Sequence, residues 1–216
     1  MKTVSSPLAK GFLADSQKLL AEEHLPHVVK CLQQLEEDEI WWRPNEASNS
    51  AGNLVLHLCG NIRQWIISNL GQTADVRDRD SEFAERGPIP RKVMIERLKQ
   101  TVREACGVLG RLPEATLLRK FTIQGLHVTG LEAIAHVVEH FAYHTGQIVF
   151  ITKLKHGKDL KFTRLPRVKK AIAKTAALSA SNSDCFLGAT VDGLCRRQNS
   201  RSYTIPAGLP ARESDG

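Results

Sequence analysis

The stretch Ala135–Ile148, A-H-V-V-E-H-F-A-Y-H-T-G-Q-I, places three of the chain's eight histidines at four-residue spacing inside an apolar helical pattern. Residues four apart on an α-helix lie on the same face, with Cβ atoms about 5–6 Å apart. His136, His140 and His144 therefore form a stripe, and two adjacent imidazoles at this spacing can share one metal ion. We expect the function of the protein to depend on this helix.

Helical periodicity extends outward from this stretch over residues 131–155 and recurs in three earlier segments. These segments are residues 12–35, residues 51–70, and a helix that follows Pro88 and Pro90 and ends before Pro113. Pro26 predicts a bend or break in the first segment, because proline removes a backbone donor. Gly71 is predicted to end the second in the left-handed conformation.

The connections between these helices have their own patterns. Residues 72–87 are charged and predict a solvated loop, whereas residues 120–129 alternate around Gly125 and predict a short hairpin. Every connection is longer than the roughly 2–8 residues usual between antiparallel neighbours. The sequence therefore predicts an all-α fold, a four-helix bundle in which long crossover connections are allowed.

Charge divides the chain into two parts. Residues 1–152 contain 17 Lys plus Arg and 18 Asp plus Glu, whereas residues 153–216 contain 13 and 5. Periodicity fades from about Arg167, where Ser, Asn, Gly, Pro and Arg dominate. We expect a bundle domain over residues 1–166 and a basic, largely disordered extension over residues 167–216. Because the bundle is close to neutral, nucleic-acid binding is an expectation for the extension alone.

Cysteine usage and the first residues indicate the compartment. The five cysteines are scattered, odd in number and contain no Cys-x-x-Cys pair, which argues against a disulfide framework and a thiolate zinc site. The first ten residues are too polar for a signal peptide, and no run approaches the ~20 apolar residues of a membrane span. We expect a cytoplasmic protein that has no membrane partner.

A histidine taken singly is most often a core or surface ring, and we interpret four of the eight in this way: His24, His27, His127 and His156. Several imidazoles on one apolar face favour a metal site over this interpretation. Each buried ring needs a polar partner, and one cation is a partner for two rings at once.

A catalytic metal site commonly has three protein ligands. His57 is the best candidate for the third, because it lies inside a predicted core helix, on the flank of its apolar face beside Asn53 and Asn61.

The segment from His136 to His140 also fits the H-x-x-E-H pattern of inverted zinc peptidases, with Glu139 as the general base. The match is weak, because those enzymes need a further carboxylate ligand well downstream. The forward motif H-E-x-x-H is absent, since Phe141 follows His140.

Two motifs together resemble the DinB/YfiT-like superfamily of metalloenzymes, particularly its small bacterial members. They are N-L-V-L-H-L-C-G-N-I-R-Q-W at Asn53–Trp65 and V-E-H-F-A-Y-H-T-G-Q-I at Val138–Ile148. The resemblance covers about residues 12–166. It implies a four-helix bundle of unusual connectivity, often a homodimer, that binds a divalent metal through one histidine of the second helix and an H-x-x-x-H pair in the last.

Carried over residue by residue, the resemblance implies that His57, His140 and His144 are the metal ligands. We expect four further residues to support them: Asn61, His136, Tyr143 and Gln147. Three neutral imidazoles leave the ion its full charge, so that it acidifies a bound water or stabilises a bound thiolate. Zinc, nickel, iron and manganese all suit such a site.

The function implied by the resemblance is a metal-dependent transferase that uses a low-molecular-weight thiol, or a hydrolase, acting on a small-molecule substrate. The residues single out no catalytic side chain beyond the ligands. The alternative is a non-catalytic, dimeric metal-binding protein that serves in stress response or as an interaction module. A structural metal site of that kind usually has four protein ligands.

Overall fold

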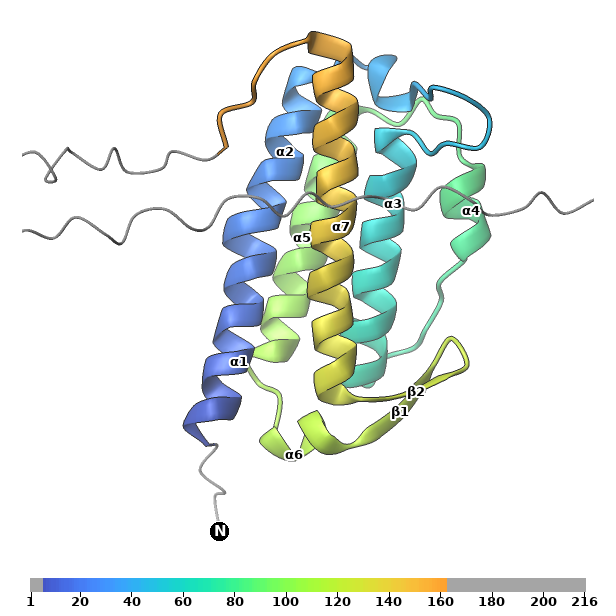
Figure 1. Ribbon diagram of the computed structural model, residues 1–216. Coiled ribbons are helices and arrows are strands. Elements are labelled where there is room, and N and C mark those ends of the chain that lie inside the picture. The colour runs from blue at the N-terminus through green and yellow to red at the C-terminus, as the bar shows by residue number, and fades with distance from the viewer. Residues whose placement is uncertain (1–5, 163–216) are drawn as a thin grey trace, which may run out of the picture. The chain divides into compact units, whose positions relative to one another are not determined.

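The computed structural model describes residues 6–162, which form a bundle of four long helical segments (Figure 1). The elements are α1 (Pro7–Lys18), the π-helical segment η1 (Leu19–His24), α2 (Leu25–Gln34), the 3-10 turn η2 (Glu39–Trp41), α3 (Ala51–Ile62), the π-helical segment η3 (Arg63–Leu70), α4 (Arg79–Ala84), α5 (Arg91–Leu109), α6 (Glu114–Leu118), β1 (Lys120–Ile123), β2 (Leu126–Thr129) and α7 (Gly130–His156). The predicted all-α bundle is confirmed. The predicted extension, residues 167–216, lies outside the described residues, and the domain division stays a prediction.

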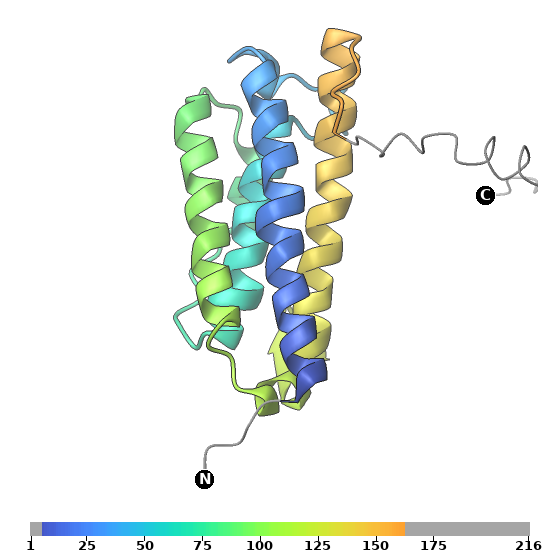
Figure 2. The same cartoon turned by 90° about the vertical axis from the view of Figure 1, so that its left-hand side faces the viewer.

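The long segments do not follow simple up-and-down topology. The segment from α1 to α2 runs parallel to α7, and α3 runs parallel to α5, whereas α3 and α7 are antiparallel neighbours (Figures 1 and 2). Two contacts mark the parallel pairs, a ring contact of His24 with Phe141 and an ion pair of Arg63 with Glu104. The connection over residues 71–90 accordingly returns along the length of the bundle, as a crossover.

The first helical segment begins at Pro7, earlier than predicted, because the Ser6 hydroxyl caps it by accepting from the Ala9 N–H. The interruption expected at Pro26 takes the form of the π-helical segment η1, which ends just before it. Pro26 then lies in the first turn of α2, and His24 and Leu25 before it keep right-handed helical backbone, so the helix continues through the proline. The chain is irregular there without breaking.

Almost the whole of α3 is buried, since Gly60 is its one residue that is not. The helix begins with a capping box, in which the Ser50 hydroxyl accepts from the Asn53 N–H and the Asn53 side chain accepts from the Ser50 N–H. The left-handed conformation predicted for Gly71 is wrong: its φ is −80°, and Gln72 has the positive φ of 58°. Glycine is needed at position 71 because a Cβ there would collide with the Ile67 carbonyl.

The connection over residues 72–87 was predicted as a solvated loop, and that prediction is wrong in its middle. It contains α4, in which Glu82 is 7% exposed. The Asn53 side-chain amide of α3 donates to the carbonyls of Glu82, at 3.0 Å, and Glu85, at 2.9 Å. These bonds fasten α4 to the core helix because a buried amide must find acceptors.

The predicted hairpin is confirmed as the antiparallel pair of β1 and β2, which leads directly into α7. A second capping box, between Thr129 and Glu132, begins α7, and Gly157 ends it with a φ of 61°. Within the described range, none of the helices combines the length and apolar character needed to cross a bilayer.

Candidate metal centre

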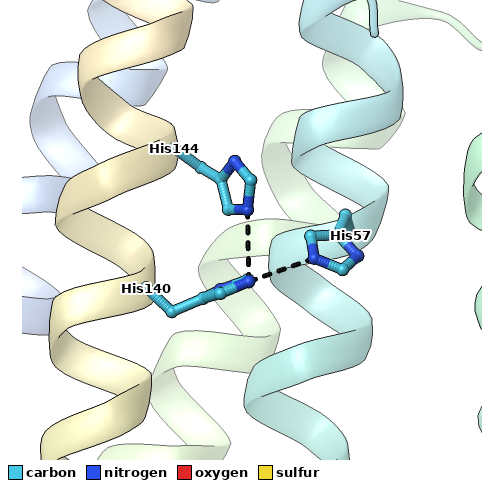
Figure 3. Close-up of side chains that lie close together, drawn as sticks. All are labelled: His57, His140 and His144. Atoms are coloured by element: carbon cyan, nitrogen blue, oxygen red, sulfur yellow. Dashed lines mark hydrogen bonds between the residues drawn. The ribbon is translucent and has the colours of Figure 1, made fainter. Parts of the chain in front are cut away.

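Three histidines point towards one another between α3 and α7 (Figure 3). The Nε2 atom of His140 lies 3.1 Å from Nε2 of His57 and 3.1 Å from Nε2 of His144. One possible ligand atom from each of the three residues lies within 4.8 Å of the other two. The structure thus brings together the three residues that the sequence analysis named as ligands, so that they could hold a metal ion.

Hydrogen bonds on the far side of two rings define which nitrogen faces the centre. His57 Nδ1 lies 2.9 Å from Oε2 of Glu82 and 3.1 Å from Nη2 of Arg77, and His144 Nδ1 lies 2.7 Å from Oε1 of Gln147. The shorter contact of His57 is with the carboxylate, which can only accept, so a proton on Nδ1 of each ring gives both rings a hydrogen bond to an oxygen. A neutral imidazole has one N–H, so a ring that has this proton on Nδ1 presents the lone pair of Nε2. These lone pairs converge on His140 Nε2, which has at most one proton to donate, whereas a cation satisfies all three nitrogens.

The spacing of the nitrogens suits a small divalent ion. Two nitrogens bound to one tetrahedral zinc ion at ~2.0–2.1 Å each lie roughly 3.3 Å apart. The two Nε2 to Nε2 distances of 3.1 Å are close to that value. The donor set of three imidazoles and these two distances are therefore compatible with a metal, and the third pair of nitrogens lies within 4.8 Å.

Burial keeps the rings of α7 in the neutral form that binds metals. Desolvation, together with the neighbouring His144 and His57, lowers the pKa of His140 to about 3. Desolvation also lowers the pKa of His144, and the hydrogen bond to Gln147 offsets this only in part. Burial therefore favours the neutral form of both His140 and His144.

A buried ion pair holds the His57 ring from behind. Arg77 donates from Nε to Oε1 of Glu82 and from Nη2 to Oε2, both at 2.8 Å, and the two side chains are 2% and 8% exposed. Burial acts to raise the pKa of Glu82, but the hydrogen bonds from Arg77 and His57 outweigh it and lower the pKa overall. An ionised carboxylate on Nδ1 orients a metal-binding histidine and makes its Nε2 more basic.

Space for this ion pair exists because residue 60 is a glycine. A Cβ on Gly60 would collide with the Glu82 carboxylate and lie 2.8 Å from Nε of Arg77. Gly60 follows His57 by three residues and so lies beside it on α3. The glycine in the motif L-C-G-N thus permits the carboxylate to reach the histidine.

Two of the predicted supporting residues contact His144. Gln147 is its hydrogen-bond acceptor and fixes its tautomer. Tyr143 is 64% exposed, and its ring packs edge-on to His144 with centroids 5.0 Å apart. Gln147 therefore orients the ring directly, whereas Tyr143 covers it from the solvent side.

The other two predicted supporting residues, His136 of α7 and Asn61 of α3, lie together one helical turn away from the three-histidine cluster. His136 stacks against Trp65, with ring centroids 4.1 Å apart, and its Nε2 lies 3.4 Å from Nδ2 of Asn61. His136 is not part of the group that can hold a metal, and Glu139 is exposed. The arrangement gives no support to the peptidase pattern over residues 136–140.

Glu82 and Arg77 were not predicted from the sequence. A metal-binding histidine usually donates its second N–H to a carboxylate or carbonyl, so that a partner for His57 could have been expected. With 23 Asp plus Glu in the chain, however, spacing alone does not single out Glu82.

The fold and the site define a four-helix-bundle protein with a candidate three-histidine metal centre. The chain belongs to a family described as a protein of unknown function (DUF1572), whose model matches residues 8–169. A DinB-like protein, YjoA, from Bacillus subtilis is similar in structure, with a TM-score of 0.49 and 21% sequence identity over 69% of this chain and 95% of that one. The family match over residues 8–169 includes both motifs on which the DinB-like resemblance rests. The comparison with curated proteins found no match.

Proposed function

We propose that His57, His140 and His144 bind one divalent metal ion (zinc, nickel, iron or manganese) and that the protein is a metal-dependent enzyme. The reaction class is transfer of a low-molecular-weight thiol to a small electrophile, or hydrolysis. The observation that supports this most is the convergence of the Nε2 atoms of His57 and His144 on Nε2 of His140, while the outer nitrogens of His57 and His144 lie against Glu82 and Gln147. A cation is the partner that satisfies such an arrangement.

The bound ion would supply Lewis acidity and a nucleophile at neutral pH. The residues of this chain hold the ligands in place for it. Glu82 and Gln147 keep protons on the outer nitrogens of His57 and His144, so that the inner nitrogens stay free. Arg77 neutralises Glu82, and the centre therefore adds no net negative charge to the ion.

The number of ligands favours an enzyme over the non-catalytic alternative. Within residues 6–162, the group of side chains that can hold the ion has three members. Closed structural zinc sites have four protein ligands, whereas catalytic sites have three and leave a position for water or substrate. A fourth protein ligand on the ion would instead support a non-catalytic stress-response or interaction protein.

Metal binding is tested with the purified full-length chain by elemental analysis and by thermal unfolding with Zn²⁺, Ni²⁺ or Mn²⁺. An ion at 100 times its Kd stabilises the native state by about 2.7 kcal/mol, which raises the Tm by roughly 5–10 °C. His140→Ala should abolish the shift. His127→Ala, which changes an exposed histidine of the hairpin, should retain it. Absence of both metal and shift would refute the proposal.

Catalysis is tested separately with the metal-loaded protein. Thiol transfer is assayed by mixing the protein with a low-molecular-weight thiol and chlorodinitrobenzene. In this reaction a carbon–sulfur bond forms, chloride leaves and the thiol proton passes to solvent. Nitrophenyl acetate tests hydrolysis. Metal binding without either activity, together with a fourth protein ligand, would favour the non-catalytic alternative. The homodimer and the cytoplasmic location stay predictions, and light scattering measures the first.

A further inference from the structure

A pocket lies beside the histidine cluster, towards the C-terminal end of α7. Its volume is about 330 Å³, and its walls include Pro44 and Ala47 before α3, Leu54 of α3, and Gln147, Phe150 and Ile151 of α7. Small-molecule sites typically have volumes of ~300–1,000 Å³. The pocket is therefore large enough for part of a small molecule.

Gln147 connects this pocket to the metal centre. The side chain lines the pocket, and its Oε1 accepts from Nδ1 of His144 at 2.7 Å. Its Nε2 carries two further protons that can be donated to a ligand. On the facing helix, Leu54 lies one turn before His57, so that the pocket and the centre occupy successive turns of the same two helices.

The lining of the pocket indicates the chemistry of its ligand. Six of its side chains are apolar, three are uncharged and polar, and none is charged. The lining offers a charged ligand no ion-pair partner, whereas its apolar side chains favour an uncharged ligand. Phe150 and Leu154 of the lining are 62% and 54% exposed, and adjoining exposed apolar side chains are typical of a ligand-binding groove.

We propose that this pocket binds the uncharged alkyl or aryl part of the substrate, while the substrate's reacting group lies at the three-histidine centre. Gln147 Nε2 donates a hydrogen bond to the polar atom between the two parts. The ligand class is thus a small neutral electrophile with an apolar substituent. This inference rests on the proposed function, because the metal ion is what holds the reacting group.

The test uses zinc-loaded full-length protein and a series of straight-chain alkyl hydroxamates, which bind metals through the hydroxamate group. Calorimetry measures the Kd from acetohydroxamate upward. Each added methylene should tighten binding roughly fourfold until the pocket is filled, from ~0.8 kcal/mol per buried CH₂. Ala47→Trp fills the pocket from an exposed loop position and should abolish this gain. Ala135→Trp, at an exposed position of α7 outside the pocket, should retain it.

The outcomes separate this inference from the proposed function. If acetohydroxamate binds but longer chains bind no tighter, or Ala47→Trp keeps the gain, the pocket assignment is wrong while the metal centre stands. If no metal binds, the proposed function fails. The neutral dye phenylnaphthylamine then tests the pocket in metal-free protein. Enhanced emission in the wild type that Ala47→Trp removes would support it, and no enhancement would overturn it.

Discussion

Substituting glutamine for Glu82 should weaken metal binding although Glu82 touches no metal. The carboxylate accepts hydrogen bonds from Nε and Nη2 of Arg77 and from Nδ1 of His57. Glutamine has one oxygen, and the guanidinium of Arg77, which can only donate, requires it. The amide NH₂ would then face His57 Nδ1 and favour the tautomer whose proton lies on Nε2. That tautomer presents no lone pair to the metal.

The expected loss follows from the role of such partners in other metal sites. Removing the carboxylate partner of a metal-binding histidine typically weakens affinity by about 10–100-fold, which corresponds to about 1.4–2.8 kcal/mol. A competition titration against a chromophoric zinc chelator measures the change in Kd. Glu104→Gln is the matched control, because Glu104 pairs with Arg63 at the surface, where the two side chains are 36% and 42% exposed. It should leave the affinity unchanged.

The result that would refute the reasoning is a Kd for Glu82→Gln within twofold of the wild type. The unfolding of each metal-free variant is measured in parallel. A general loss of structure would also lower the unfolding temperature of the metal-free variant and broaden its transition. Weaker zinc binding by a variant that unfolds cooperatively shows that Glu82 acts through the orientation of His57.

Three further predictions concern the packing and titration of the bundle. Gly60→Ala should lower zinc affinity at least tenfold by displacing Glu82, whereas Gly146→Ala, where a Cβ meets nothing within 4 Å, should stabilise the helix by about 0.5–1 kcal/mol; equal affinities would contradict this. Below pH 6.5 the unfolded chain protonates His140, whereas the folded chain, with a pKa of about 3, does not. The free energy of unfolding of metal-free protein should therefore decrease as the pH is lowered below 6.5, by up to about 1.4 kcal/mol for each pH unit. Urea titrations at several pH values should show a smaller decrease in the free energy of unfolding for His140→Phe than for the wild type. The same pH dependence in both proteins would contradict this prediction. Burial raises the pKa of Cys59 to about 11, so that mass spectrometry should find it unalkylated by iodoacetamide at pH 8 until the protein unfolds; rapid labelling of the native protein would exclude this.

Local sequence patterns were sufficient for the four long helical segments, whereas the choice of His140 and His144 over His136 came from the resemblance of the two motifs. Apolar residues at helical spacing predicted the four long segments, and alternation around Gly125 predicted the hairpin. Four-residue spacing placed His136, His140 and His144 on one face, and the flank position of His57 directed it towards a neighbouring helix. These features depend on residues within a few turns of one another, which is why periodicity reveals them. The role of the three histidines as ligands stays a prediction.

Tertiary structure decided which histidines meet and what holds them. The antiparallel alignment of α3 with α7 brings His57 to His140 and His144 and leaves His136 beside Asn61. That alignment depends on the packing of the whole core, and residue spacing within one helix carries no information about it.

The partner of His57 was equally hidden in the sequence. Glu82 lies in a stretch whose charges predict exposure, and it is buried because Asn53 fastens α4 to α3 and Gly60 leaves room for the carboxylate. Buried polar groups are satisfied by whichever partners the fold brings near them. The sequence by itself therefore determined the four long helical segments and the histidine stripe, and the resemblance of its motifs singled out the candidate ligands. The alignment of those ligands and the position of Glu82 beside His57 depended on contacts between distant segments.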